Sequence, residues 1–124
     1  MKILSRDQVL LLHSQLIDRY GGIHGVRDEG LLDSALNVPF QGFGDHDFFP
    51  TVIDKAVRLS YGLIQNHPFH DGNKRIGALA LLTLLDLNGI ELEATNQELE
   101  QVIMNVAAGT NDYEAFHAWV LTHI

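Results

Sequence analysis

Apolar side chains recur every three or four residues along most of the chain, which is the period of an amphipathic helix. Apolar residues at positions 9, 12, 16 and 17 predict a first helix that ends near Arg19. Ser5, with Gln8 three residues later, has the spacing of a capping box and marks the start of that helix. Asp28 predicts the start of a short second helix that continues through Leu36. The glycine-rich segment YGGIHGVRD separates the two helices.

Four more helices are predicted in the rest of the chain, over residues 51–66, 73–88, 95–108 and from 111 onward. Thr95 with Glu98, and Asn111 with Glu114, have the capping-box spacing that opens the last two helices. The fourth helix has the body IGALALLTLLDL, which is apolar on almost every side. Such a helix is normally buried at the centre of a fold. Gly89 is expected to cap its end.

The segments between the helices are less regular. Residues 90–94 predict a short extended piece, and Trp119 of the last helix is expected to seal the core. The stretch NVPFQGFGDHDFFP is the one long irregular segment, and FGDHDFFP alone holds three of the six Phe residues. These rings either form an exposed docking surface or lid, or pack onto the core as Phe usually does.

These elements predict an all-α fold, a compact bundle of about six helices around a buried central helix. The length of 124 residues fits one domain, so residues 1–124 are expected to form a single unit. The apolar content of 46% excludes a disordered chain. Arg6 and Asp7 interrupt the N-terminal apolar run, and no other apolar run reaches membrane-spanning length. We therefore expect a cytoplasmic protein without a signal peptide or a membrane anchor.

The charge balance narrows the kinds of ligand that the protein is expected to bind. The formal net charge is -8 with only eight Lys and Arg, so a general electrostatic grip on nucleic acid is not expected. An acidic protein can still bind a phosphate through a small local cluster of positive charge. The chain has no cysteine, which excludes disulfides and thiolate metal sites.

The stretch HPFHDGNKR interrupts the helical pattern and holds the candidate chemistry. Lys74 and Arg75 lie in the first turn of the fourth helix, where positive charges oppose the helix dipole. A bound anion would reverse that cost, because a helix N-terminus already presents free N–H groups. Gly72 allows a close approach of the backbone to a ligand, and Asn73 can cap the helix or bind a phosphate oxygen. The pattern thus predicts a phosphate site.

Two more residues of the stretch add to this prediction. Asp71 is a hard oxygen ligand beside the predicted phosphate, and Mg²⁺ prefers one or two carboxylates together with phosphate oxygens. Histidine is the residue type most often used as a general base, so His67 can act as a base toward a hydroxyl. Phe69 is expected to anchor the loop in the core.

These residues carry a resemblance to a known family. The string HPFHDGNKRIGA resembles the Fic motif, His-x-Phe-x-Asp/Glu-Gly-Asn-x-Arg-x-x-Arg, with Ala78 in the last place. It is more similar to the Doc (death on curing) branch, in which Lys follows the Asn and the final Arg is absent. The segment RYGGIHGVRDEGLLDSALNVP also resembles the N-terminal region of Doc proteins, so the resemblance covers most of the chain.

The resemblance implies a role for each matching residue. It implies that His67 is the general base toward a target hydroxyl and that Asp71 holds Mg²⁺. The implied phosphate ligands are Gly72, Asn73 and Arg75, together with Lys74, which matches the Lys that marks the Doc branch. It also implies that the Phe-rich loop, Phe40 to Phe49, lies where Fic proteins carry a flap that docks the target.

Ala78 affects the expected reaction, because the final Arg of AMP-transferring Fic enzymes grips the nucleotide phosphates. Doc proteins lack it too, and they transfer the terminal phosphate of ATP to a threonine of elongation factor Tu, which halts translation. The resemblance therefore implies an ATP-dependent protein phosphotransferase, the toxin of a pair with a Phd-type antitoxin. AMP transfer stays open as an alternative.

Two further alternatives come from other classes of protein. His70-Asp71 resembles the His-Asp pair of metal-dependent phosphohydrolases, which need further ligands from other helices. Histidines elsewhere in the chain that could serve include His13, His24, His46 and His117. A binding module that has lost catalysis is the last alternative. The helical histidines are more simply read as packed or solvent-facing, and the GGIHGVRD loop as a segment that shapes the turn, with Arg27 and Asp28 pairing or capping.

Overall fold

A computed structural model describes all of residues 1–124, and most of the chain is helical. The elements, in chain order, are α1 (Arg6–Tyr20), α2 (Glu29–Asn37), the 3-10 turn η1 (Val38–Phe40), β1 (Gly42–Phe43), β2 (His46–Asp47), α3 (Val52–Asn66), α4 (Asn73–Leu87), α5 (Asn96–Ala107) and α6 (Tyr113–Leu121). The predicted all-α fold with six helices is confirmed.

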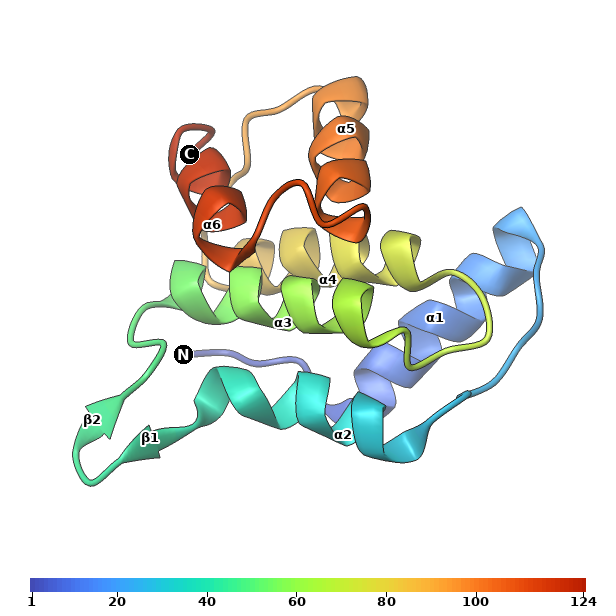
Figure 1. The fold of residues 1–124 in the computed structure, drawn as a ribbon, viewed down its shortest axis with the longest axis horizontal. Helices are drawn as coiled ribbons and strands as arrows, with labels where there is room; N and C mark the ends of the chain where they lie inside the picture. Colours follow the sequence, from blue (N-terminus) through green and yellow to red (C-terminus); the bar gives the residue numbers. More distant parts are fainter.

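Helices α3 and α4 form the centre of the bundle (Figure 1). Helix α3 packs against α2, α4, α5 and α6, and α4 packs against α1, α3 and α5. In Figure 1, α2 lies on one side of this pair and α5 and α6 on the other, with α1 running outward beside α4. The centre is therefore a pair of helices, because α3 is as well covered as the predicted central helix α4.

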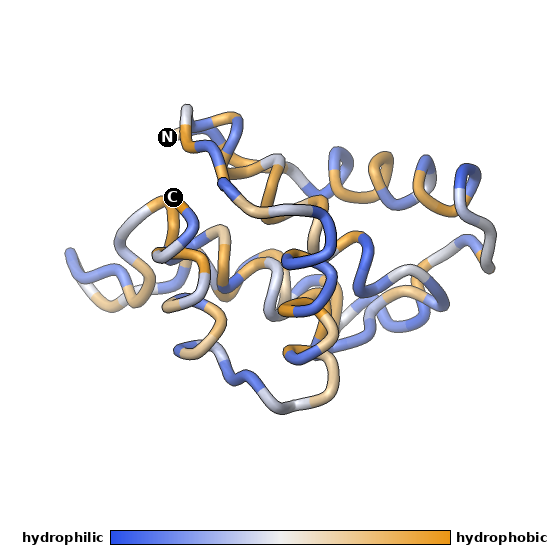
Figure 2. Tube along the Cα trace, turned by 90° about the horizontal axis from the view of Figure 1, so that it is seen from above, coloured by the Kyte–Doolittle hydropathy of each residue, from blue (hydrophilic) through white to orange (hydrophobic).

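The core lies between these layers and draws residues from every helix. Figure 2 shows the apolar positions of α1 on the side turned toward the rest of the molecule. Twenty buried apolar residues form one continuous cluster. Helix α4 supplies Ile76, Ala80, Leu81, Leu84 and Leu85. Its other side is partly exposed at Leu82 and Leu87, so the helix is not apolar and buried all round.

Helices α3 and α4 approach most closely at Gly77. A Cβ at this position would lie 2.5 Å from Cγ1 of Ile64 and 3.3 Å from the carbonyl oxygen of Ser60. The Ser60 hydroxyl donates a 2.7 Å hydrogen bond to the Gly77 carbonyl oxygen. The absent side chain therefore lets the two helices touch, and Ser60 links them.

Most helix ends agree with the sequence. The capping boxes at Ser5 and Thr95 form, and Asp28 accepts from the Leu31 N–H. The last helix corrects the prediction, because Asp112 caps it by accepting from the Ala115 N–H, and Asn111 with Glu114 forms no box. Asp112 is one residue closer to the first helical residue, which is where a cap must lie.

The irregular segments differ more from expectation. Residues 90–94 form no strand. The Phe-rich stretch instead contains a two-residue antiparallel ladder, in which Gly42 pairs with Asp47 and Phe43 with His46. Phe43 is 82% exposed and Phe48 56% exposed, so the rings do not all pack onto the core. Trp119 is half-buried against the core, and its ring stacks on His123 at 4.1 Å.

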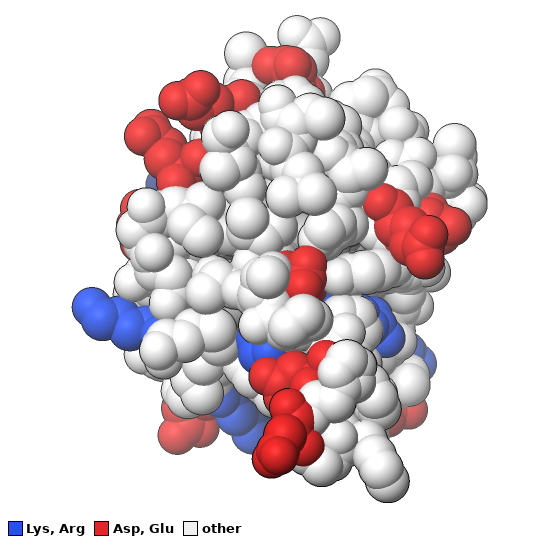
Figure 3. Space-filling model, turned by 90° about the vertical axis from the view of Figure 1, so that its left-hand side faces the viewer, with Lys and Arg blue, Asp and Glu red and all other residues white.

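Charged side chains form no broad basic surface on the face that carries the hairpin. Figure 3 shows acidic side chains there in several separate groups, with the few basic ones interspersed among them on the lower half. No helix in the structure is both long enough and apolar enough to span a membrane.

Replacing Gly77 by Ala is expected to destabilise the fold, because the new methyl group overlaps Ile64. We expect a loss of about 1–3 kcal/mol in the free energy of unfolding, despite the better helix propensity of Ala. The matched control is Gly30→Ala in α2, where the nearest atom to an added Cβ is at 3.4 Å and no loss is expected. Urea unfolding of both variants checks this, and equal effects would contradict it.

Candidate active site at the start of α4

The loop between α3 and α4, residues 67–72, reverses the chain through two left-handed residues. His67 has φ 48° and ψ 53°, and it is the single non-glycine residue with positive φ. Gly72 has φ 79° and precedes α4. A left-handed conformation is uncommon for a non-glycine residue, although histidine adopts it more readily than most and it often ends a helix. His67 therefore ends α3 and starts the loop.

The side chain of Asn73 fixes the loop from inside. Its Oδ1 accepts from the Phe69 N–H and its Nδ2 donates to the Phe69 carbonyl oxygen, both at 3.0 Å. Phe69 is 1% exposed, as the predicted core anchor. The Asn73 side chain is thus fully engaged with the Phe69 backbone, and it neither caps α4 nor points at a phosphate. Gly72 is the N-cap residue, and no side chain caps the helix.

His13 of α1 lies under the same loop. Its ring stacks on Phe69 at 3.7 Å between ring centroids, and its Nε2 lies 2.7 Å from the Asp71 carbonyl oxygen. Burial lowers the pKa of His13 below its ordinary value, although its hydrogen bond to the Asp71 backbone partly opposes this. The neutral ring must donate from Nε2, because a carbonyl oxygen only accepts. His13 therefore supports the loop.

The glycine-rich loop between α1 and α2 lies directly on the motif. Val26 forms a β-bridge with Phe69, and the His70 N–H donates to the Gly25 carbonyl oxygen at 3.2 Å. The Arg27 guanidinium donates to the carbonyl oxygens of His67, at 2.7 Å, and Asn66, at 3.0 Å. These bonds satisfy carbonyls at the end of α3 that the helix leaves free. The prediction that this loop shapes the turn is confirmed.

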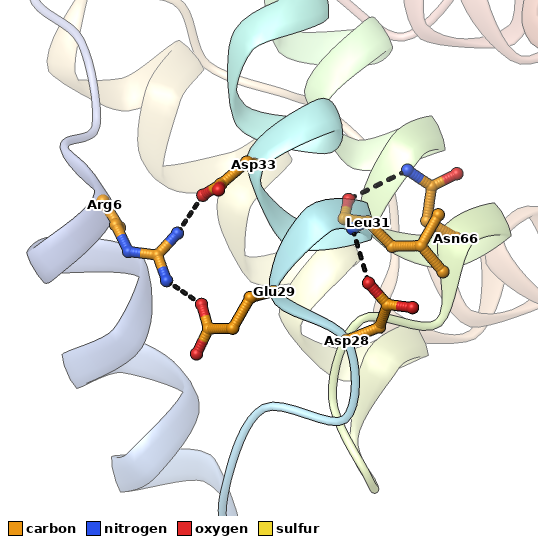
Figure 4. Close-up of polar contacts among 6 residues, drawn as sticks. All are labelled: Arg6, Asp28, Glu29, Leu31, Asp33 and Asn66. Atoms are coloured by element: carbon orange, nitrogen blue, oxygen red, sulfur yellow. Dashed lines mark hydrogen bonds and ion pairs between the residues drawn. The ribbon is translucent and has the colours of Figure 1, made fainter.

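Helix α2 is held in place on both sides of the same region. Figure 4 shows Asp28 capping α2 at Leu31, whose carbonyl oxygen accepts from the Asn66 side chain of α3. On the other side of α2, Arg6 of α1 forms ion pairs with Glu29 and Asp33 (Figure 4). The end of α3 that carries His67 is therefore tied to α2 as well as to the glycine-rich loop.

The Phe-rich hairpin lies elsewhere, which corrects an expectation. It precedes α3, whereas His67 follows α3, so the 15-residue helix separates the two by about 22 Å. Figure 1 shows the hairpin and the 67–72 loop at opposite ends of α3. The loop from Phe40 to Phe49 does not occupy the position of a flap over the motif. Residues 21–28 lie there instead.

The N-terminus of α4 presents an arrangement suited to an anion. The N–H groups of its first turn have no partner within the helix, and that turn contains no acidic residue. Lys74 and Arg75 are both exposed, and the Arg75 guanidinium lies 4.4 Å from the ring centroid of Tyr20. No carboxylate neutralises either charge. The helix end and two cations therefore point toward the same space.

That space is a pocket of about 670 Å³ between α4 and α5. Residues 72–75 and Ala78 line one wall. The wall on α5 consists of Asn96, Leu99, Glu100, Ile103 and Met104. The volume is in the range of small-molecule sites. A phosphate-bearing ligand with an apolar portion fits both walls.

Asp71 lies beside this pocket in a constrained position. Its Oδ2 accepts from the Ile23 N–H at 2.6 Å, which leaves the second carboxylate oxygen free. Gly22 allows this contact, because a Cβ there would lie 3.0 Å from Cβ of Asp71. One free carboxylate oxygen beside a phosphate site fits Mg²⁺, which takes most of its ligands from phosphate and water.

The structure does not support a phosphohydrolase centre. Such a site needs several protein ligands around the metal, and no group of three or more His, Asp or Glu side chains lies close enough to hold one. His13 contacts the backbone of Asp71, while His117 pairs with Asp54. His70 is exposed. The other histidines do not assemble around His70 and Asp71.

Comparison with known proteins agrees with this geometry. The family model described as "Fic/DOC family" matches residues 3–85, which include α1 to α3, the motif loop and most of α4. "Toxin Doc" of Mycolicibacterium smegmatis is 41% identical over 91 residues, which are 73% of this chain and 68% of that protein. "Protein kinase doc" of Escherichia phage P1 is 25% identical over 109 residues, 88% of this chain and 85% of that protein. The chain belongs to the Fic/Doc family, in its Doc branch, as the motif predicted.

Sequence reasoning did not identify two residues of the site. His13 and Tyr20 contact the motif from α1, more than fifty residues earlier in the chain. No local pattern marks either contact, since both depend on how α1 packs. The helical spacing that places His13 among the apolar positions of α1 was the available signal.

The buried His13 predicts a specific pH dependence. Its pKa is lowered in the folded state, so the unfolded chain binds the proton first as the pH falls through about 6.5. Stability from this group is complete above that pH and is lost below it. We expect the melting temperature of the wild type to fall more between about pH 7.5 and about pH 5.5 than that of His13→Phe. Identical losses in the two proteins would contradict this role.

Proposed function

We propose that this protein is a Doc-type toxin that transfers a phosphate from ATP to a hydroxyl of a protein target. The observation that carries the proposal is the uncapped N-terminus of α4, which faces a pocket together with the unpaired Lys74 and Arg75. Cations at this end of a helix are unfavourable for the isolated fold. A triphosphate offsets that cost and uses every donor at this end.

Ala78 favours phosphoryl transfer over AMP transfer. This residue lines the pocket one turn after Arg75, at the place of the final Arg in the motif of AMP-transferring Fic enzymes. With a small side chain there, this wall offers no second guanidinium to grip the inner phosphates. The relative named "Protein kinase doc" supports the same choice.

His67 is the proposed catalytic residue. Its backbone carbonyl is held by Arg27, while its ring is exposed and has no hydrogen-bond partner. The ring nitrogen is therefore free to accept the proton of a target hydroxyl as that oxygen attacks the terminal phosphate. The left-handed backbone at His67 ends α3 and places this residue at the start of the loop that leads to Gly72.

The remaining site residues supply positioning and charge. The backbone N–H groups from Gly72 onward, with Lys74 and Arg75, bind phosphate oxygens and stabilise negative charge in the transition state. Asp71 offers one carboxylate oxygen to Mg²⁺. When bound, the metal would neutralise charge on the phosphates. Asn73 contributes its backbone N–H and holds the loop in shape through its side chain.

The likeness to Doc proteins supports a proposal for the partner and the target of this chain. The name "Toxin Doc" supports a toxin–antitoxin pair, and we propose a Phd-type antitoxin as the neutralising partner. By its resemblance to Doc proteins, elongation factor Tu is the proposed target, and its modification in the cytoplasm would block translation.

Isotope labelling tests the reaction. The protein is incubated with Mg²⁺, elongation factor Tu and ATP labelled at either the γ or the α phosphate. We expect γ label on the target, with a loss of roughly 10²–10⁴-fold in rate for His67→Ala. Label from the α position would instead identify AMP transfer. If the folded protein transfers neither label while a control enzyme is active, both phosphoryl transfer and AMP transfer are contradicted.

Expression of the same His67→Ala variant in a bacterial host separates catalysis from binding. Loss of growth arrest is expected, because the general base is absent. Arrest at the wild-type level, with equal protein amounts, would identify a binding module that acts without chemistry.

Tyr20 is proposed as a positioning residue for Arg75. The ring restrains a long side chain that has no ion-pair partner, so its removal should weaken ATP binding before chemistry. We expect Tyr20→Ala to raise the KM for ATP roughly 2–10-fold with a smaller change in kcat. Tyr20→Phe keeps the ring face and should behave as the wild type. A phenylalanine variant as poor as the alanine variant would contradict the stacking role.

A further inference from the structure

A second groove lies along α3, on a different face from the phosphate pocket. It has a volume of about 500 Å³ and lies between α3 and the start of α6. Its residues are Phe49, Arg58, Tyr61, Gln65, Asn66, Asp112, Tyr113 and Glu114. None of these residues belongs to the phosphate pocket. The groove runs from the end of the Phe-rich segment to the C-terminal end of α3, where His67 follows.

Arg58 is the unusual residue of this groove. It is half-buried, yet it forms no ion pair and no hydrogen bond within the chain. Its guanidinium lies over two rings instead, 5.4 Å from the centroid of Tyr61 and 5.9 Å from that of Phe49. The planar group is thus held by stacking, while its N–H donors remain available. A guanidinium in this state suits a carboxylate, which it can bind through two parallel hydrogen bonds.

The two acidic residues of the groove do not use this charge. Asp112 caps α6 by accepting from the Ala115 N–H, and Glu114 lies in the first turn of the same helix. The positive end of the α6 dipole stabilises both carboxylates where they are. Both side chains are exposed, so salt screens their effect on the groove, whereas Arg58 is partly shielded from solvent. The charge in this groove that is still available to pair with a ligand is therefore the positive charge of Arg58.

The Arg58 guanidinium lies part of the way along α3 toward His67, the proposed catalytic base. Its Nη1 lies 3.6 Å from where a Cβ of Gly62 would be, so the side chain extends along α3 toward His67. Five residues of helix from that level to His67 correspond to about 8 Å along the axis. An extended peptide covers this distance with roughly two or three residues.

We propose that this groove recognises the acceptor protein, with Arg58 binding an acidic side chain roughly two or three residues away from the hydroxyl presented to His67. The proposal rests on the proposed transfer to a protein hydroxyl and adds a determinant of substrate choice. Phe49, Tyr61 and Tyr113 provide apolar contact for the peptide segment between the two points. The occupant is an acceptor segment, because the lining of the groove reaches Gln65 and Asn66, which directly precede His67 in the chain.

Peptide binding tests the proposal without requiring turnover. Labelled peptides carry one central Thr, and one Glu is placed at each position in turn on either side. Fluorescence anisotropy measures their affinity for the inactive His67→Ala protein in the absence of ATP. We expect tightest binding when Glu lies two or three residues from Thr on one side, and a loss of about tenfold when that Glu becomes Gln.

Variants of Arg58 identify the group that reads the charge. Arg58→Met keeps the apolar stem and should remove the preference for Glu over Gln, whereas Lys2→Met makes the same charge change at a distant exposed site and should preserve it. Arg58→Glu should favour a peptide with Lys in place of Glu. If the Arg58 variants do not fold, the Glu and Gln peptides on the wild type still test the expected spacing, and the absence of a preference for Glu at that spacing would overturn the proposal.

The outcomes separate this inference from the transfer reaction itself. If the peptides bind in the expected order while the wild type transfers no label from ATP, the groove assignment is supported and the proposed phosphotransferase activity is overturned. Label transfer to elongation factor Tu with no dependence on Glu position, or with an unchanged preference in Arg58→Met, would overturn the groove assignment.

Discussion

The site depends on one pair of hydrogen bonds, between the Asn73 side chain and the backbone of Phe69. Phe69 can be buried only if its peptide groups find partners, because unpaired polar groups in a core are costly. Asn73 supplies both a donor and an acceptor in a single side chain. The buried ring then provides the surface on which His13 stacks, and His13 in turn holds the carbonyl of Asp71. The loop therefore has its shape before any ligand arrives.

This loop joins the end of α3, which carries the proposed base, to the start of α4, which carries the proposed phosphate site. Helix α3 ends at His67, and α4 begins after Gly72 with free N–H groups and two cations. The contact at Gly77 limits how closely the two helices approach, so it also affects the distance between the proposed base, His67, and the proposed phosphate site at the start of α4. Preorganised charge of this kind costs no rearrangement at the moment of reaction.

The sequence predicted the helices well, because apolar period and caps are local properties. Ser5, Asp28 and Thr95 each cap the helix that their pattern indicated. Errors arose where a local pattern had two readings. Asn111 and Asp112 are both good caps, and the start of the helix selects between them.

The site was predicted in composition rather than in detail. The order of residues in the motif predicts an anion at the start of α4, and this stays a prediction; the structure shows there an uncapped helix end with Lys74 and Arg75 exposed. The same order cannot show that the Asn73 side chain hydrogen-bonds to the Phe69 backbone, because a buried amide and a ligand-binding amide look alike in a sequence. Contacts from α1 to the motif depend on tertiary packing and have no local signature.

The wall that α5 contributes to the phosphate pocket has a consequence for the order of events during synthesis. Residues 96–104 leave the ribosome after residues 67–75, which hold the proposed base and the proposed phosphate-binding turn. A growing chain that has reached the end of α4 holds all the charged groups of the site but only one side of its pocket. The pocket between α4 and α5 thus forms only after α5 has been made, so under the proposed function a shorter copy would lack a complete site for ATP.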